Sequence, residues 1–165
     1  MEVYTWANNE IFESAIDRDK GIVMGRLKKG ADLLEGILAV CEHYGIKTAS
    51  FYCIGSLFTL GYYQFDQNPD GTLYYSDPII RDEPGELIAG NGFIGLDADN
   101  NLDVHYHGTY LDKTGKVSGG HFIPGKNEVA VTIEFTIHYT EQIDLQRKPD
   151  EYYQIPIFHF NQREA

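Results

Sequence analysis

A single stretch of helical periodicity stands among many segments with strand character, and this imbalance limits the folds open to the chain. Between residues 33 and 44, apolar side chains recur at intervals of three and four, which is typical of a helix with one buried face. Asp32 and Glu35 form a capping-box pattern before this segment, and Gly45 follows it where a left-handed residue ends many helices. The strand-like segments are rich in Tyr, Phe, Thr and Ile and are separated by turn residues; they span residues 22–27, 48–54, 57–65, 73–80, 86–96, 104–111, 117–122, 128–139 and 153–160. Strands without alternating helices predict an α+β domain, a mostly antiparallel sheet with one principal helix packed on it.

The length of 165 residues is typical of one domain. We expect residues 1–21 to be a loosely structured N-terminal lead-in, with a short helix around residues 10–16, and residues 22–165 to form the domain. Residues 140–150 are rich in charge and are expected to be a solvated loop.

Composition and charge exclude several classes of protein. Hydrophobic residues make up 42% of the chain, which excludes a disordered protein, and no run approaches the roughly 18 apolar residues of a membrane span. The net charge of -12 disfavours DNA as a partner, because affinity for phosphates comes mainly from Lys and Arg. The first residues lack the features of a secretory signal, so we expect a cytoplasmic protein with no membrane partner. Cys41 and Cys53 are then expected to be reduced, buried thiols, with a disulfide as the alternative.

Residues 104–121 can fold into a hairpin that brings three histidines together. Side chains in a strand alternate between faces, so His105 and His107 project from the same face. A five-residue loop closing at Leu111 and Val117 would place His107 directly across from His121. Gly115 suits the left-handed position of such a loop, and Asp112 can accept hydrogen bonds within it. In addition, Gly119 and Gly120 allow a close approach of another backbone beside His121.

Three converging imidazoles predict a metal site with His105, His107 and His121 as ligands. Neutral imidazole suits zinc, copper, nickel and iron, whereas calcium and magnesium prefer oxygen, so zinc or another divalent transition metal is expected. The alternative is a row of surface histidines on a half-exposed hairpin.

Two other motifs in the chain resemble ligand sites but lack an essential part of them. Residues 90–95 match the glycine pattern of dinucleotide sites, yet a turn follows them instead of the helix that must receive the pyrophosphate. Asp97, Asp99 and Asn101 resemble the start of a calcium loop, but Leu102 stands where that loop needs glycine. We interpret the first as a strand with close packing and the second as a hairpin turn.

Two carboxylates are candidates for a role beside the metal. Glu134 shares a polar strand face with Thr132, Thr136 and His138 and is the best candidate for a catalytic base. The alternative is a solvated carboxylate or one paired with Arg26. Asp103 lies on the same face as His105 and could accept a hydrogen bond from an imidazole N–H, or could simply be a turn residue at the strand end.

Several of these motifs, in this order, resemble the plant and prokaryote conserved domain, also written PPC or PCC. The resemblance covers residues 22–160 and its most specific part is the histidine block. The matching segments are Arg26-Leu27, Gly30-Ala31-Asp32-Leu33, Gly55-Ser56-Leu57, Glu86-Leu87-Ile88-Ala89-Gly90-Asn91, His105-Tyr106-His107, Gly119-Gly120-His121 and Glu134. The chain departs from many prokaryotic members at residues 100–103, where a Gly-x-Pro is frequent.

The resemblance implies an α+β fold that assembles as a homotrimer, with the histidines and a metal, commonly zinc, near a subunit boundary. Plant relatives carry an AT-hook, Arg-Gly-Arg-Pro, which this sequence lacks. Three functions follow as hypotheses. The first is a trimeric zinc-containing module that binds a small anionic ligand or a protein segment, with a regulatory role. The second is a zinc-dependent hydrolase or lyase, and the third, which the charge disfavours, is a DNA-binding protein.

Overall fold

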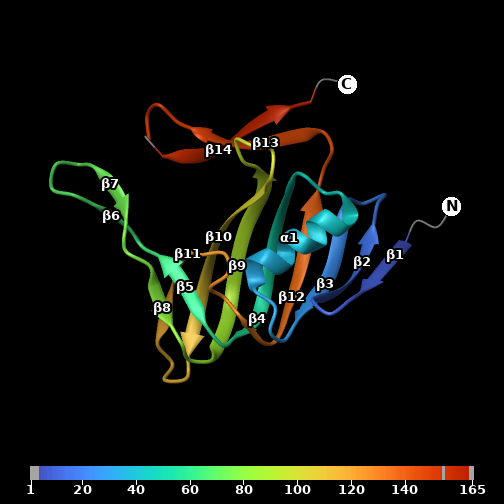
Figure 1. The fold of residues 1–165 in the computed structure, drawn as a ribbon, viewed down its shortest axis with the longest axis horizontal. Helices are drawn as coiled ribbons and strands as arrows, with labels where there is room; N and C mark the ends of the chain where they lie inside the picture. Colours follow the sequence, from blue (N-terminus) through green and yellow to red (C-terminus); the bar gives the residue numbers. More distant parts are fainter. Residues whose placement is uncertain (1–3, 154, 164–165) are drawn as a thin grey trace.

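The structure is a computed structural model that describes residues 4–153 and 155–163, and most of its strands belong to one sheet (Figure 1). The described chain contains one helix, α1 (Leu33–Tyr44). Its strands are β1 (Tyr4–Asn8), β2 (Phe12–Asp17), β3 (Ile22–Lys28), β4 (Ala49–Leu57), β5 (Leu60–Tyr63), β6 (Phe65–Gln67), β7 (Leu73–Tyr75), β8 (Ile79–Arg81), β9 (Gly85–Leu96), β10 (Leu102–Asp112), β11 (Val117–Phe122), β12 (Val129–Tyr139), β13 (Ile143–Pro149) and β14 (Pro156–Gln162).

The main sheet has the strand order β1-β2-β3-β12-β4-β9-β10-β11-β5-β8, and neighbours along this path are antiparallel. Strands β13 and β14 form a hairpin that meets the sheet through one parallel pair, Gln146 and Leu96. Strands β6 and β7 form a separate two-stranded arm, which projects at the left of Figure 1. The predicted fold class, a mostly antiparallel sheet with one helix, is confirmed.

Helix α1 lies across one face of the sheet (Figure 1) and begins and ends where the sequence predicts. The Oδ1 atom of Asp32 accepts hydrogen bonds from the backbone N of Leu34 and Glu35, each at 3.0 Å, and Gly45 ends the helix with φ 72°. A side chain at Gly36 would lie 2.8 Å from that of Leu27, so glycine lets the helix pack close to β3.

The residues between α1 and the sheet form the hydrophobic core. Alternate residues of each central strand point toward the helix, among them Val23, Phe51, Cys53, Ile94, Tyr106 and Phe135, all at most 3% exposed. The Sγ atom of Cys53 lies 3.1 Å from the hydroxyl oxygen of Tyr106. Cys41 and Cys53 are free and buried, as predicted. Burial raises the pKa of both thiols to about 12, so neither is a reactive thiolate near neutral pH.

The other side of the sheet, which we call the open face, carries exposed apolar side chains. Met24, Tyr52, Ile54 and Phe93 are between 44% and 60% exposed there. His105 shares this face with Phe93, and His107 shares it with Asn91 and Tyr52, because residues paired across antiparallel strands point to the same side.

Several sequence predictions of secondary structure are wrong. The N-terminal lead-in is not loosely structured, because residues 4–8 form β1 and 12–17 form β2, and the predicted strands 57–65 and 73–80 are each divided into shorter strands. Residues 10–16 do not form a short helix, because 12–17 form β2, paired with β3. Phe12 and Ile16 are four residues apart, a spacing that suits one face of a helix or of a strand, and both are buried in the sheet. Residues 140–150 are not a solvated loop, because most of them form β13. The domain boundary at residue 22 stays a prediction, although β1 and β2 continue the sheet beyond it.

The two deceptive motifs have the structures that the sequence predicts. Residues 90–95 lie within β9, where a side chain at Gly90 would overlap the ring of Tyr106. Asp97 forms the turn that follows, since its Oδ1 accepts hydrogen bonds from the backbone N of Asp99 and Asn101. The first motif is therefore a closely packed strand and the second a turn, as interpreted from the sequence.

Candidate metal centre

The hairpin of β10 and β11 has the predicted register, with Leu111 opposite Val117 and His107 opposite His121. Its loop is held by Asp112, whose Oδ1 accepts hydrogen bonds from the backbone N of Thr114 at 2.8 Å and of Lys116 at 3.0 Å. Gly115 has φ 83°, the left-handed conformation that the loop length requires. The turn chemistry therefore fixes which residues face His107.

Gly119 and Gly120 allow β11 to lie tightly between its two neighbours. Their φ angles are 151° and 159°. A side chain at Gly119 would come 2.0 Å from the carbonyl oxygen of Gly108 in β10, and one at Gly120 would come 2.5 Å from that of Tyr63 in β5. The close backbone approach predicted beside His121 is therefore present on both sides.

The three histidines converge on one point of the open face. The Nε2 atoms of His105 and His107 are 3.2 Å apart. The ring centroids lie 5.0 Å apart for His105 and His107, 5.0 Å for His105 and His121, and 5.3 Å for His107 and His121. One potential ligand atom from each ring lies within 4.8 Å of the others. Two nitrogens bound tetrahedrally to one zinc ion are about 3.3 Å apart, so the separation of His105 and His107 fits a shared ion.

Burial and mutual repulsion keep these imidazoles neutral near pH 7. The pKa of His121 falls to about 4, mainly because the ring is buried and also because His105, His107 and Arg147 lie near it. The pKa of His105 is lowered by burial, then by His107 and Arg147, and the pKa of His107 is lowered by burial. Neutral imidazole is the form that binds a metal, so no proton has to be displaced.

The Nδ1 atom of His121 gives a second sign that the site fits a metal. Within the described residues, this buried nitrogen has no hydrogen-bond partner. Leaving a buried polar atom without a partner is costly, and such atoms call for an explanation. A metal bound through Nδ1 of His121 would give this nitrogen a partner, which explains its position.

The side-chain partner of Asp103 is an arginine and not an imidazole. Its carboxylate instead forms an ion pair with Arg147 of β13, and its Oδ1 accepts a hydrogen bond from the backbone N of Val104 at 2.8 Å. Arg147 also donates from Nη2 to the carbonyl oxygen of Val104 at 3.3 Å, and it lies 4.4 Å from the centroid of the Phe158 ring. Of the two roles that the sequence left open for Asp103, the described contacts give no support to hydrogen bonding with an imidazole; the carboxylate orients an arginine beside the site.

Aromatic side chains lie on the other side of the cluster. Tyr63 is paired with His121 across β5 and β11, with ring centroids 6.3 Å apart. Tyr75, from the arm, has its ring centroid 5.3 Å from that of His121 and 6.0 Å from that of Tyr63. The cluster therefore lies between an arginine and a pair of tyrosines.

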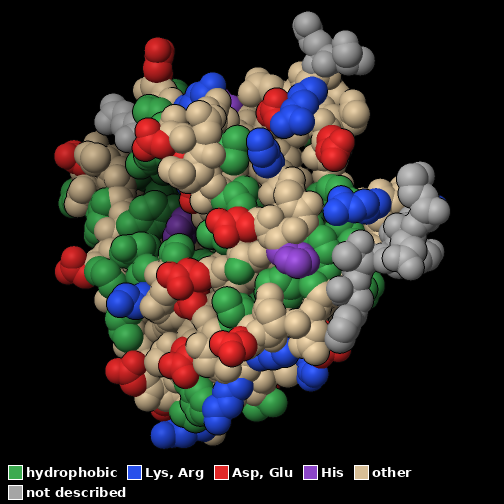
Figure 2. Space-filling model, turned by 45° about the vertical axis from the view of Figure 1, so that its right-hand side comes forward, with side chains coloured by type: hydrophobic (Ala, Val, Ile, Leu, Met, Phe, Trp, Pro, Cys, Tyr) green, Lys and Arg blue, Asp and Glu red, His purple; other side chains and the backbone are tan. Residues whose placement is uncertain are grey.

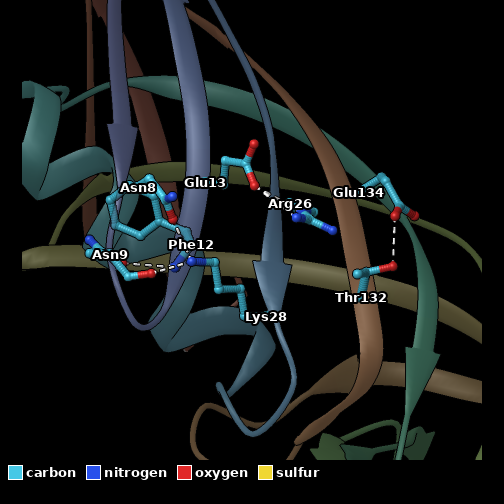
Figure 3. Close-up of polar contacts among 8 residues, drawn as sticks. All are labelled: Asn8, Asn9, Phe12, Glu13, Arg26, Lys28, Thr132 and Glu134. Atoms are coloured by element: carbon cyan, nitrogen blue, oxygen red, sulfur yellow. Dashed lines mark hydrogen bonds and ion pairs between the residues drawn. The ribbon is translucent and has the colours of Figure 1, made fainter.

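Glu134 lies on the open face, but the structure does not bring it to the histidines within one chain. β12 is separated from β10 by β4 and β9, which at a strand spacing of about 4.8 Å corresponds to roughly 14 Å. Glu134 accepts a hydrogen bond from the hydroxyl of Thr132 at 2.6 Å and is exposed (Figure 3). Arg26 lies opposite it in β3 but pairs with Glu13 at 2.8 Å (Figure 3). A base role for Glu134 stays a prediction, and within one chain it would be out of reach.

Three residues at the site, Arg147, Tyr63 and Tyr75, are not predicted from the sequence. Arg147 falls in the segment predicted to be a solvated loop, although Ile143, Leu145 and Arg147 alternate with polar residues as in a strand. Tyr63 could have been found from its register with His121 if the pairing of β5 with β11 had been known. No local pattern points from Tyr75 to the hairpin.

The fold and the histidine cluster define a class of protein: an α+β domain, one sheet covered by a single helix, with a candidate metal centre on the hairpin beside the open face. The chain matches the Plants and Prokaryotes Conserved (PCC) domain over residues 16–140 and belongs to this family. The family resemblance found in the sequence is confirmed. No curated protein sequence gives a significant match.

Several solved structures share the fold. A plant- and prokaryote-conserved protein from Pyrococcus horikoshii has 25% identity and a TM-score of 0.68, with 96% of this chain and 99% of that chain covered. A metal-containing protein from Archaeoglobus fulgidus has 23% identity and a TM-score of 0.71 with the same coverage. A candidate DNA-binding protein from Bacteroides thetaiotaomicron has 18% identity and a TM-score of 0.72, again with 96% and 99% covered.

In the described part of the chain, no helix is both long enough and apolar enough to cross a membrane.

Proposed function

We propose that this protein is a metal-binding module of the PCC family in which His105, His107 and His121 hold zinc or another divalent transition metal. The observation that carries the proposal is the convergence of three neutral imidazoles, with one potential ligand atom from each within 4.8 Å of the others. Three protein ligands leave one tetrahedral position for a small molecule or a segment of another protein. We place the function there, as ligand binding or regulation. The metal-containing relative from Archaeoglobus fulgidus supports this reading.

A homotrimer is part of the same proposal. The family resemblance implies it, and the open face supports it, since Met24, Tyr52, Ile54 and Phe93 expose large apolar side chains on one side of the sheet. Contiguous exposed apolar surface is typical of an interface between proteins. A second copy would bury these side chains and would place the histidine cluster near a subunit boundary.

Enzyme chemistry has less support than ligand binding. A zinc hydrolase or lyase needs a base within hydrogen-bond reach of the substrate, and the histidine group contains no carboxylate. Asp103 is engaged by Arg147, and Glu134 lies several strands away. A bound zinc ion would supply Lewis acidity, but the residues near it are suited to hold a ligand.

DNA binding ranks last, although two similar structures are described as candidate DNA-binding proteins. The net charge is -12, and Figure 2 shows acidic side chains interspersed with basic ones over the visible face. Because nonspecific affinity for DNA depends on Lys and Arg neutralising phosphates, we expect no shift of duplex DNA near 100 mM salt. A salt-sensitive shift at that ionic strength would support DNA binding instead.

Metal content tests the central proposal. We expect untagged protein, purified without chelator, to contain about one zinc or similar ion per chain by elemental analysis. His107→Asn should lose the ion. His138→Asn is the matched control, because His138 is also exposed and is paired with Ser50 on the same face. Wild-type protein that takes up no divalent transition metal even at excess, or equal metal content in the two variants, would overturn the proposal.

Oligomeric state tests the assembly. Light scattering after size-exclusion chromatography should give about three times the chain mass of 18.7 kDa. Met24→Glu should shift this toward the monomer, since it places a charge among the exposed apolar side chains. A monomer at all concentrations for the wild type would contradict the trimer and would leave the metal proposal intact.

A further inference from the structure

The two sides of the histidine cluster differ in chemistry, and the difference indicates what kind of ligand the site takes. Strands β10 and β11, which carry the histidines, lie between β9 and β5 in the sheet. Arg147 lies at the His105 end of the cluster, because it contacts Asp103 and Val104, the two residues before His105 in β10. Tyr63 and Tyr75 reach it from the β5 side. A ligand above the imidazoles would therefore meet a cation on one side and aromatic rings on the other.

Arg147 is held in one orientation by three contacts. Its Nε pairs with Asp103, its Nη2 donates to the carbonyl oxygen of Val104, and its guanidinium lies over the ring of Phe158. Both polar partners immediately precede His105 in β10. The guanidinium has five N–H donors, and within the described residues those on Nη1 have no protein acceptor. The side chain is 20% exposed, so a ligand can reach it.

Arg147 brings a positive charge beside the cluster, because Asp103 and Val104, which it contacts, are the two residues before His105 in β10. The protein as a whole carries a net charge of -12, so binding of an anion is favoured where the local charge is positive. A carboxylate matches the paired N–H donors of a guanidinium.

The aromatic side of the cluster is partly exposed to solvent. Tyr75 is 39% exposed and Phe65, whose ring centroid lies 5.5 Å from that of Tyr75, is 54% exposed. Neighbouring exposed apolar side chains often mark a binding site. Aromatic rings stack or meet edge to face with a planar partner at centroid distances of about 4.5–7 Å.

We propose that the histidine site is a receptor for a small aromatic carboxylate, whose carboxylate lies between the bound metal and Arg147 and whose ring packs against Tyr75. The proposal rests on the metal site proposed above and names the class of ligand that it takes. Arg147 recognises the charge, and Tyr75 recognises the ring. Arg147 comes from β13, beyond the residues 16–140 that match the family.

The test uses the zinc-loaded full chain and isothermal titration calorimetry with benzoate as the probe. Benzamide, which has the ring without the charge, and acetate, which has the charge without the ring, are the matched ligands. We expect benzoate to bind at least about tenfold more tightly than either, because a charge-assisted hydrogen bond and an aromatic contact each contribute. Equal binding of benzoate and benzamide, or of benzoate and acetate, would overturn the proposal.

Variants separate recognition from structural support. Arg147→Gln should weaken benzoate binding roughly tenfold to 100-fold. Arg163→Gln is the control, since Arg163 pairs with Asp144 on the same hairpin and should leave binding unchanged. Tyr75→Leu should weaken benzoate about two- to tenfold and acetate little, without altering the C-terminal hairpin. Equal effects of the two arginine variants would show that Arg147 only holds the hairpin and would overturn its role in recognition.

Zinc affinity distinguishes the two proposals. If the wild type binds zinc but no benzoate up to about 10 mM, the ligand proposal fails and the metal proposal stands. If it binds no zinc, both fail. We expect Arg147→Gln to keep its zinc while losing affinity for benzoate, which a collapse of the site would not produce.

Discussion

Phe51 and Cys53 in β4 are at most 2% exposed, whereas Tyr52 and Ile54 in the same strand are 50% and 54% exposed. The first two face α1 and the other two lie on the open face. Burial of apolar area stabilises a fold by about 25 cal/mol per Å², so the side covered by the helix supplies most of that stability. The open face keeps apolar side chains and three imidazoles in contact with solvent. A single strand thus contributes alternate residues to the core and to the exposed open face.

The largest effect on stability should follow from weakening the contact between α1 and the covered face of the sheet. Ile37→Ala removes a side chain that is 0% exposed and should lower the free energy of unfolding by about 2–5 kcal/mol. Urea denaturation measures it. Leu38→Ala on the same helix is the control and should cost less, because Leu38 is only partly buried. Equal losses would mean that the covered face is not the main source of stability.

Metal binding should make the open face contribute to stability as well. At zinc about 100 times above its dissociation constant, binding to the folded state alone adds about 2.7 kcal/mol to the free energy of unfolding. Thermal denaturation with and without zinc should show the gain in wild type and in His138→Asn. His107→Asn should show no gain. A full gain in this variant would mean that zinc stabilises the protein at a site other than the histidine cluster.

A smaller effect should appear when the metal-free protein is acidified. The pKa of His121 is about 4 in the folded chain and near its ordinary value of 6.5 when unfolded. Between these values the unfolded chain binds the proton and the folded chain does not, so stability is full above pH 6.5 and falls as pH is lowered toward 4. Urea midpoints at pH 7.5 and 5.0 test this, with His121→Phe as the comparison. A wild-type profile as flat as that of the variant would contradict it.

The smallest effect should come from an exposed residue of the open face. Met24 is 60% exposed, so Met24→Thr should change the free energy of unfolding of the monomer by no more than about 0.5 kcal/mol. Val23→Thr, the adjacent position on the covered face, buries a hydroxyl and should cost about 1–3 kcal/mol. If the two variants of the monomer lose similar free energies of unfolding, the two faces do not differ in their contribution to stability. The comparison applies to the monomer, because a trimer would bury Met24.

Local chemistry made the histidine hairpin predictable. The conformation of Gly115 and the hydrogen bonds accepted by Asp112 fix a five-residue loop, and the loop fixes the register of His107 with His121. The same holds for α1, where Asp32 and Gly45 mark both ends. These elements depend on contacts between residues near one another in the sequence.

Elements that depend on distant partners could not be predicted in this way. Strand β13 buries only Leu145 fully, so its charged sequence resembles a solvated loop until its pairing with β14 is known. Phe12 and Ile16 fit a helix or a strand equally well, and only the pairing of β2 with β3 decides. Arg147 reaches the site through a segment more than 40 residues from Asp103, which no local pattern indicates.

The C-terminal hairpin is joined to the sheet mainly by side chains, and this has a consequence for how such proteins diverge. β13 meets the main sheet at one residue pair, Gln146 and Leu96, whereas the histidines belong to strands paired along much of their length. Mutation can therefore lengthen, replace or delete the hairpin while the three histidines keep their places. We expect descendants of a common ancestor to retain the three histidines and to vary the hairpin that carries Arg147. Ligand specificity would then change through exchange of this C-terminal hairpin.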